Sequence, residues 1–147
     1  MKEIKLLDCT LRDGGFVNDW EFGYGNIINI FERLISSGVD VLEIGFLDDR
    51  RPFDKNRTIM PDTKSADDIF GRLDKGNAMI VAMIDYGTCR IENLAPCAES
   101  FIDGIRVIFK KHVMKEAIAY CREVKQLGYQ VYVQAVSITS YSDREIL

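Results

Sequence analysis

The chain has 147 residues, 47% of them hydrophobic, and 19 Lys and Arg against 23 Asp and Glu give a formal net charge of −4. This composition is typical of a globular domain with a hydrophobic core. It lacks the run of about 20 apolar residues that spans a membrane, the apolar segment and cleavage site of a signal peptide, and the basic cluster of a nucleic-acid-binding protein. We therefore expect a cytoplasmic protein with neither a membrane nor a nucleic acid as its partner.

Apolar strands alternate with amphipathic helices along the chain. Compact apolar runs predict strands at residues 4–10, 39–46, 79–85, 105–109 and 129–138. Apolar residues spaced three and four apart predict helices at residues 20–37, 65–76 and 113–127, and a short helix at 90–98 that Pro96 interrupts. Ser65 is the expected N-cap of the second helix, and Gly38, Gly76 and Gly128 are the expected helix ends.

Strands that are apolar on both faces and are joined by helices predict a parallel sheet covered by helices. A (β/α)₈ barrel uses about 31 residues per unit, so this chain holds fewer than five of the eight units. An open five-stranded sheet is the alternative. Ser142 and Glu145 form a capping box that begins another helix, and the chain stops two residues after Glu145, which favours the barrel. The predicted fold is α/β, a parallel (β/α)₈ TIM-barrel type, with residues 1–147 as its truncated N-terminal half.

Residues 7–15, LDCTLRDGG, are the segment with the clearest chemical content. They lie where the first strand ends, and ligands of parallel α/β folds bind at that end of the strands. Arg12 offers a fork of donors that stays charged, and Asp13 offers an oxygen ligand for a divalent cation. Gly14 and Gly15 allow a sharp turn and the close approach of a substrate. An arginine beside a metal-bound carboxylate suits a reaction that passes through an enolate.

Glu43 supports the same interpretation. It lies on the second strand, on the face opposite to Leu42 and Ile44, so it points into the barrel if those two residues pack against helices. A carboxylate on a buried strand needs a partner, and Arg12 is the available one. The pair could instead be purely structural, and Asp13 could merely cap the turn.

The run LLDCTLRDGG, together with EIGF on the second strand, resembles the HMGL-like family, the DRE-TIM metallolyases, and in particular aldolases of the 4-hydroxy-2-oxovalerate type. The resemblance covers the whole chain as the first four to five units of the barrel. It implies that Arg12 stabilises an enolate, that Asp13 binds a divalent metal such as Mg²⁺ or Mn²⁺, and that Glu43 orients Arg12 or relays a proton. Gly14 and Gly15 become substrate-binding residues, and the substrate becomes a 2-oxo acid.

Two departures from the family pattern concern histidine. The aldolases carry a histidine base two residues after Arg-Asp-Gly, where this chain has Phe16, and the acyl-CoA synthases have Glu-Gln in place of Gly15 and Phe16. The family's His-x-His metal ligands are absent, because His112 is the single histidine and we expect it to be solvated. The general base is therefore unassigned, and the catalytic site is incomplete in this chain.

These observations predict a metal-dependent aldolase or lyase that acts on a 2-oxo acid through an enolate. One alternative is a Claisen-type acyl-CoA synthase. Another is a non-catalytic half-barrel, whose open sheet edge and apolar interior would drive self-association; we expect a homo-oligomer in either case.

The remaining polar positions are weaker candidates. The segment 47–63 is long for its place and is either a lid or a solvated loop. Asp8 and Thr10 are expected to support Arg12. We expect no catalytic role for residues at the ends of later strands or in the first loop, namely Asp85, Tyr86, Gln134, Ser137, Asn18 and Asp19. The four cysteines, none in a Cys-x-x-Cys pair, are expected to be free thiols: Cys9, Cys89, Cys97 and Cys121.

Overall fold

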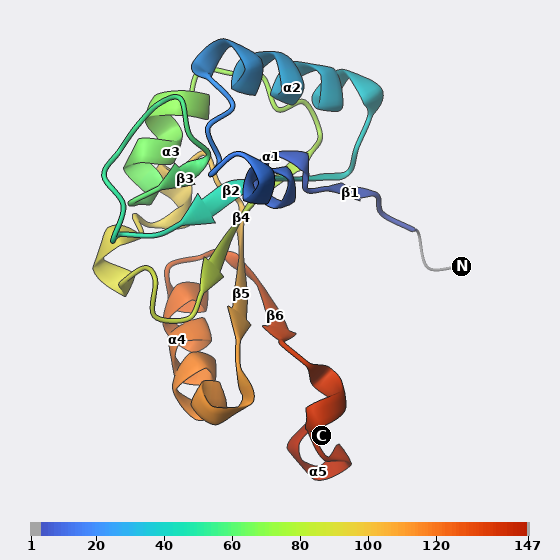
Figure 1. The fold of residues 1–147 in the computed structure, drawn as a ribbon, viewed down its shortest axis with the longest axis vertical. Coiled ribbons are helices and arrows are strands. Elements are labelled where there is room, and N and C mark those ends of the chain that lie inside the picture. Colours follow the sequence, from blue (N-terminus) through green and yellow to red (C-terminus); the bar gives the residue numbers. More distant parts are fainter. Residues whose placement is uncertain (1–3, 147) are drawn as a thin grey trace.

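The computed structural model describes residues 4–146 and shows a curved parallel sheet (Figure 1). Five strands follow one another in chain order: β1 (Leu7–Asp8), β2 (Val41–Leu47), β4 (Met79–Asp85), β5 (Gly104–Phe109) and β6 (Gln130–Ala135). A further short strand, β3 (Ile59–Met60), pairs with the end of β2, and every strand pair is parallel. The sheet curls into half of a barrel, so the predicted fold class is confirmed.

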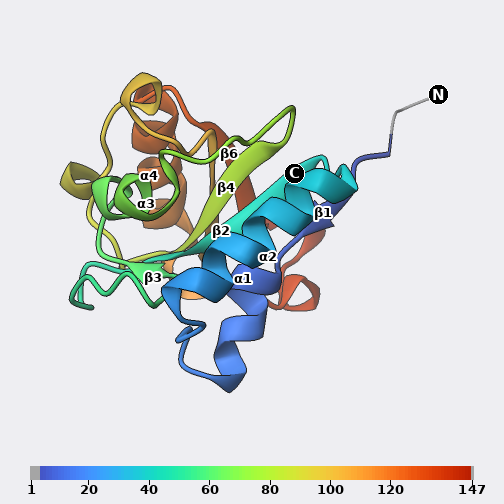
Figure 2. The same cartoon turned by 90° about the horizontal axis from the view of Figure 1, so that it is seen from above.

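Three helices cover the outer face of this sheet, as Figures 1 and 2 show from two directions. They are α2 (Tyr24–Ser37), α3 (Thr63–Phe70) and α4 (Met114–Gln126). Two single-turn helices, α1 (Thr10–Asp13) and α5 (Asp143–Ile146), follow β1 and β6. Short 3₁₀ turns occupy Gly14–Val17, Ile91–Asn93, Cys97–Glu99, Lys111–Val113 and Ile138–Ser140.

The hydrophobic core lies between the helices and the outer face of the sheet. Alternate strand residues enter it because side chains along a strand point to opposite faces. The strand residues in this core are Leu42, Ile44, Leu47, Met60, Ile80, Ala82, Ile84, Ile105 and Val107. They pack against helix residues that include Ile27, Phe31, Ile69, Phe70, Cys121 and Val124. The opposite, concave face of the sheet therefore holds the other half of each strand.

The predicted elements are recovered in order, but several boundaries differ. The last strand ends at Ala135 instead of residue 138, and the predicted helix at 90–98 is two 3₁₀ turns. The first strand is only Leu7–Asp8, since the chain turns into α1 at Thr10 instead of continuing as a strand. The first long helix begins at Tyr24, four residues later than predicted. The prediction of Ser65 as an N-cap is wrong: Asp62 caps α3 by accepting a hydrogen bond from the Ser65 N–H at 2.7 Å, and the helix ends at Phe70.

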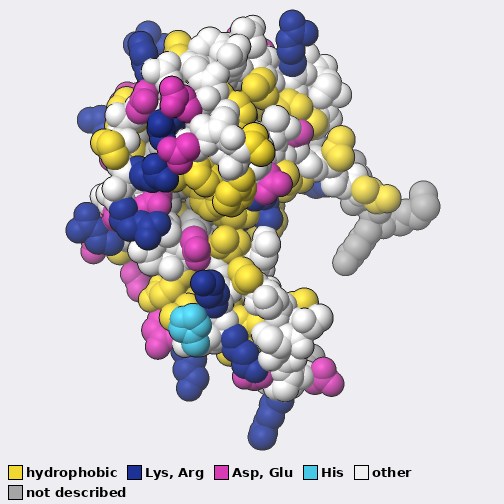
Figure 3. All heavy atoms as spheres, in the orientation of Figure 1, with side chains coloured by type: hydrophobic (Ala, Val, Ile, Leu, Met, Phe, Trp, Pro, Cys, Tyr) yellow, Lys and Arg dark blue, Asp and Glu magenta, His cyan; other side chains and the backbone are white. Residues whose placement is uncertain are grey.

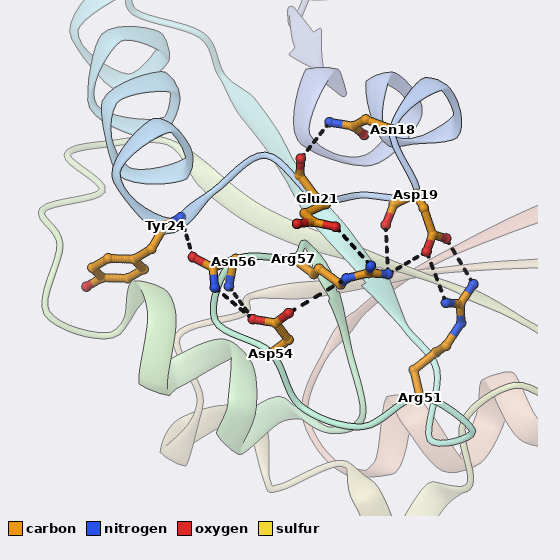
Figure 4. Close-up of polar contacts among 8 residues, drawn as sticks. All are labelled: Asn18, Asp19, Glu21, Tyr24, Arg51, Asp54, Asn56 and Arg57. Carbon is orange, nitrogen blue, oxygen red and sulfur yellow. Dashed lines mark hydrogen bonds and ion pairs between the residues drawn. The ribbon is translucent and has the colours of Figure 1, made fainter.

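The segment between β2 and β3 is fastened to the rest of the chain by charged groups (Figure 4). Arg57 contacts Asp19 at 2.5 Å and Glu21 at 3.1 Å, and Arg51 contacts Asp19 at 3.1 Å. We call these residues, with Asp54, the charged clasp. Hydrogen bonds from Arg57 and Arg51 lower the pKa of Asp19, so its carboxylate stays ionised. The clasp and β3 attach segment 47–63 to its neighbours, and its role as a lid or as a solvated loop stays a prediction.

Gly45 permits the pairing of β3 with β2. Its φ is +150°, a conformation that side chains rarely adopt, and a Cβ atom there would overlap the backbone carbonyl of Thr58. The next residue, Phe46, donates its N–H to that same carbonyl at 3.0 Å. The loop thus approaches the strand at a distance that only glycine allows.

The capping box near the C-terminus and the cysteines follow the sequence prediction. Glu145 accepts hydrogen bonds from the Ser142 N–H at 2.8 Å and hydroxyl at 2.7 Å, which is the predicted capping box. All four cysteines are free thiols. Within residues 4–146, no helix is both long and apolar enough to cross a membrane.

Candidate active site

Arg12 lies at the carboxyl end of β1, where several contacts fix its backbone. Leu11 is fully buried, and its carbonyl accepts a hydrogen bond from the Thr58 hydroxyl at 2.6 Å. The Arg12 carbonyl accepts one from the Trp20 indole at 2.7 Å. Asp8, at the end of β1, accepts a hydrogen bond from the Thr10 N–H at 2.8 Å. The guanidinium is therefore held over the concave face of the sheet.

Glu43 is the centre of the site. Its side chain is 0% exposed, and the two carboxylate oxygens have different arginine partners. Oε2 accepts from Arg12 Nε at 2.6 Å, and Oε1 accepts from Arg106 Nη1 at 2.7 Å. The structure thus brings together Arg12 and Glu43, which the sequence predicts as partners. It also places a second arginine on the same carboxylate.

Arg106 is the residue that the sequence analysis missed. It lies in the middle of β5, and its Nη2 donates to Gln134 Oε1 on β6 at 2.6 Å. A single arginine inside the apolar run of residues 104–109 is a signal in itself, because a buried cation requires a partner. That signal indicates that Arg106 needs an anionic or polar partner, but the sequence does not show that this partner is Glu43, 63 residues earlier.

A continuous row of hydrogen bonds crosses the concave face and joins Arg12, Glu43, Arg106 and Gln134. Burial lowers the stability of the charged form of Arg12, but the hydrogen bond and charge of Glu43, helped by Asp13, outweigh it and raise the pKa of Arg12. Both oxygens of Glu43 are used, whereas Arg12 Nη2 and Arg106 Nε have no hydrogen-bond partner among residues 4–146. Two cations around one buried anion therefore leave donors for an anionic ligand.

Asp13 is placed differently from Glu43. Its side chain is 62% exposed, and one oxygen accepts from Arg12 Nη1 at 2.5 Å. Residues 4–146 contain no group of three or more His, Cys, Asp or Glu side chains arranged to hold a metal ion. Asp13 alone offers one carboxylate, so the described residues do not by themselves make up a divalent-metal site. The predicted role of Asp13 as a metal ligand stays a prediction.

Gly14 and Gly15 form the 3₁₀ turn after α1, and they differ in what surrounds them. A Cβ at Gly15 would overlap the Trp20 ring, whereas one at Gly14 would make ordinary contact with Phe22. Gly15 is buried and makes room for Trp20. The structure thus gives Gly15 a packing role, and the predicted contact of both glycines with a substrate stays a prediction.

A recess of about 260 Å³ adjoins Arg12 at the carboxyl ends of β2, β4 and β5. Three aromatic rings form one side of it: Phe16 lies 4.9 Å from Trp20 and 6.2 Å from Phe46, measured between ring centroids. The Arg12 guanidinium lies 5.8 Å from the centroid of Phe46. The other lining residues are Asp48, Arg50, Arg51, Ile59, Asp85, Thr88 and Ile108. Phe16 is thus part of an aromatic wall.

The remaining candidates lie around this centre. Asp85 is exposed at the end of β4, on the rim of the recess. Asp19 belongs to the charged clasp, and Asn18 donates to the Glu21 carbonyl at 3.0 Å within the same loop. Ser137 has a left-handed backbone, with φ of 56°, in the turn after β6. His112 is exposed in the 3₁₀ turn before α4, in agreement with its predicted solvation.

Comparison with known proteins supports the fold. No protein-family model matches the chain, and no curated protein matches it significantly. Among solved structures, the chain is similar to the crystal structure of the N-terminal domain of a putative aldolase from Bacteroides vulgatus, with a TM-score of 0.63 and 20% sequence identity. The similarity covers 95% of this chain and 48% of the Bacteroides chain, so this chain spans about half the length of that one.

Proposed function

We propose that this chain carries the arginine and carboxylate part of an aldolase-type active site, which binds a 2-oxo acid and stabilises its enolate. The observation that supports this proposal most strongly is the buried carboxylate of Glu43 shared by Arg12 and Arg106. The Bacteroides protein, described as a putative aldolase, points in the same direction, while the 20% identity supports only the fold.

The proposed chemistry uses the donors that Glu43 leaves free. In a retro-aldol step, a base removes the proton of the 4-hydroxyl group, the bond between C3 and C4 breaks, and its electrons move to the 2-oxo oxygen. An aldehyde or ketone leaves, and the enolate then takes a proton at C3. Arg12 Nη2 is the donor for the developing oxyanion, since Nε and Nη1 are already bound to Glu43 and Asp13. Glu43 orients the arginine, because neither of its oxygens is free.

Arg106 complements Arg12 in this proposal. Its two terminal nitrogens are fixed by Glu43 and Gln134, so it contributes positive charge from a rigid position. A 2-oxo acid carries a carboxylate next to the reacting carbonyl, and that carboxylate can accept hydrogen bonds from the donors that Arg12 and Arg106 leave free. A divalent metal, if the complete enzyme uses one, would take Asp13 as one ligand and its other ligands from outside the described residues.

Binding of oxalate, a planar mimic of the enolate of pyruvate, tests the proposal. Calorimetric titration should show that Arg12→Gln weakens oxalate binding by at least about tenfold, which is the loss expected for one charge-assisted hydrogen bond. Arg33→Gln removes the same charge from an exposed position of α2 and should leave the affinity unchanged. Equal affinities for the wild type and Arg12→Gln would refute the proposal. Pyruvate release from 4-hydroxy-2-oxovalerate, followed with and without Mn²⁺, tests turnover and metal dependence directly.

A second candidate function, self-association of the half-barrel, is favoured by the two edges of the sheet. Within the described residues β1 pairs only with β2, and β6 only with β5, so both edges present unpaired backbone groups. Val133 on β6 is 52% exposed and Ile138 beyond it 50% exposed. Sedimentation equilibrium should give a mass above the 16.8 kDa of one chain. Val133→Lys on the β6 edge should shift that mass toward 16.8 kDa, and a monomeric wild type would contradict this candidate.

A further inference from the structure

The recess beside Arg12 has apolar walls that the proposed enolate chemistry does not require. Phe16 is 65% exposed although it lies in a turn fixed by neighbouring contacts, and its ring packs edge-on against Trp20 and Phe46. Ile108 on β5 and Ile59 on β3 line the same space. Phe16 is exposed and is backed by the partly buried rings of Trp20 and Phe46. An exposed aromatic side chain at a concave apolar site is typical of a binding surface, because leaving it in water is unfavourable. Figure 3 shows hydrophobic side chains gathered around the middle of this side of the molecule.

The arginines of the recess are already paired with carboxylates, and Asp85 on its rim adds a further negative charge, whereas Arg12 and Arg106 each keep a donor nitrogen that is free within the described part of the chain. Arg50 makes two hydrogen bonds to Asp48, at 2.7 and 2.6 Å, and Arg51 is paired with Asp19 of the charged clasp. The recess therefore presents no unpaired arginine to an anion. An anionic group would bind at Arg12 and Arg106, and an uncharged apolar group would bind in the recess.

The recess lies close to the Arg12 guanidinium. Phe46 belongs to the recess and lies under the Arg12 guanidinium, at 5.8 Å from its central carbon, and Trp20 donates its indole N–H to the Arg12 carbonyl. One small molecule can therefore occupy both. We propose that the recess receives an aromatic or branched apolar arm of the substrate, so that this site selects 2-oxo acids with such an arm over short ones such as pyruvate. This inference rests on the proposed function, whose 2-oxo acid head it places at Arg12.

Phe16 and Trp20 set this selectivity. The phenylalanine supplies the exposed ring of the aromatic wall, and Gly15 lets Trp20 pack behind it. Trp20 is the single tryptophan of the chain, so its fluorescence reports on the recess without labelling. Burial of a phenyl group of the ligand against these rings should strengthen binding by at least about tenfold.

Two probes that differ only in this arm test the inference: 2-oxo-4-phenylbutanoate and 2-oxobutanoate. Titration of the 147-residue chain, by calorimetry and by Trp20 fluorescence, should give at least about tenfold tighter binding of the phenyl probe. Phe16→Ala should reduce this preference at least threefold. Val17→Ala is the matched control, since Val17 lies in the same turn, is 92% exposed and does not line the recess; it should leave the preference unchanged.

The outcomes separate this inference from the proposed function. Equal affinity for the two probes, no binding of the phenyl probe, or a preference that survives Phe16→Ala would overturn the inference. Arg12→Gln should weaken both probes by the same factor and keep their ratio. If Arg12→Gln weakens neither probe while the preference and its loss in Phe16→Ala persist, the recess is supported and the 2-oxo acid head at Arg12 is refuted.

Discussion

The two faces of the curved sheet differ in what fills them, although the same strands build both. On β2, Leu42 and Ile44 point into the helix-covered core, whereas Glu43 between them points to the concave face and meets two arginines. On β5, Ile105 and Val107 are in the core, and Arg106 between them is in the ionic network. Stability is thus concentrated on one face, and the groups with reactive potential on the other.

Because of this division, substitutions on the two faces should impair different properties of the protein. A core residue contributes through apolar area and packing, which have no direction. A residue of the network contributes through directed hydrogen bonds whose loss leaves a buried charge without its partner. Substitutions of adjacent residues can therefore separate loss of folding from loss of binding.

The largest loss of stability is expected from the helix-covered face. Phe70 is fully buried, with its ring centroid 5.5 Å from that of Phe31, and Phe70→Ala should lower the free energy of unfolding by about 4 kcal/mol. Urea denaturation measures this loss. Phe53→Ala, at a half-exposed position, should cost less than about 1 kcal/mol. Folded Phe70→Ala should bind oxalate with wild-type affinity, and a weakened affinity would break the division between the two faces.

Glu43→Gln is expected to lower both stability and binding. It leaves Arg12 and Arg106 without their shared anion, and the free energy of unfolding should fall by about 3 kcal/mol in urea denaturation. Adding Arg106→Met should recover part of that loss, because one uncompensated cation is removed. If the two substitutions are instead additive, Glu43 and Arg106 do not act as a pair.

A smaller effect is expected at the N-cap of α3. Asp62→Ala removes the acceptor for the Ser65 N–H and should cost about 1 kcal/mol in thermal or urea unfolding. Asp68→Ala, an exposed position of the same helix, removes the same charge without a cap and should cost less. Equal losses from the two substitutions would assign the effect to charge alone. Neither change touches the concave face, so oxalate binding should be unaffected.

The smallest effect is expected at the Ser142–Glu145 capping box, which belongs to neither face of the sheet. Hydrogen bonds from the Ser142 N–H and hydroxyl, and then from Lys111, lower the pKa of Glu145 from its usual 4.5 to about 2. Because the folded pKa is the lower one, this contribution is complete above about pH 4.5 and is lost as the pH falls toward 2. NMR titration of the Ser142 amide should follow that loss. A Glu145 carboxyl that titrates near 4.5 would show that the capping box does not form.

The order of strands and helices could be predicted from the sequence because apolar periodicity is local. The parity of β2 alone placed Glu43 opposite to Leu42 and Ile44, and the available cation identified Arg12 as its partner. The N-cap of α3 was misplaced by three residues, since Asp62 and Ser65 both have the side chain of a cap and only the path of the incoming loop decides between them.

The rest of the site depends on residues far apart in the chain. Arg106 on β5 reaches Glu43 on β2 across β4. The alternation of side chains predicts that both lie on one face, but their contact also depends on the curvature of the sheet. The aromatic recess needs Phe46 beside Phe16 and Trp20, a contact set by the charged clasp and by the left-handed backbone of Asp19 and Trp20. The sequence predicts that Gly15 makes room for a substrate, whereas in the structure the neighbour that needs this room is the Trp20 ring.

Gly45 shows how a residue can be indispensable without any chemistry of its own. The Thr58 carbonyl lies where its Cβ would be, and the positive φ adds a second penalty for every other amino acid. In a saturation mutagenesis scan, position 45 should therefore tolerate as few replacements as a catalytic residue, although its side chain is a single hydrogen atom. Intolerance at that position would report the seating of β3 on β2, and only a binding measurement could distinguish it from the intolerance of Arg12.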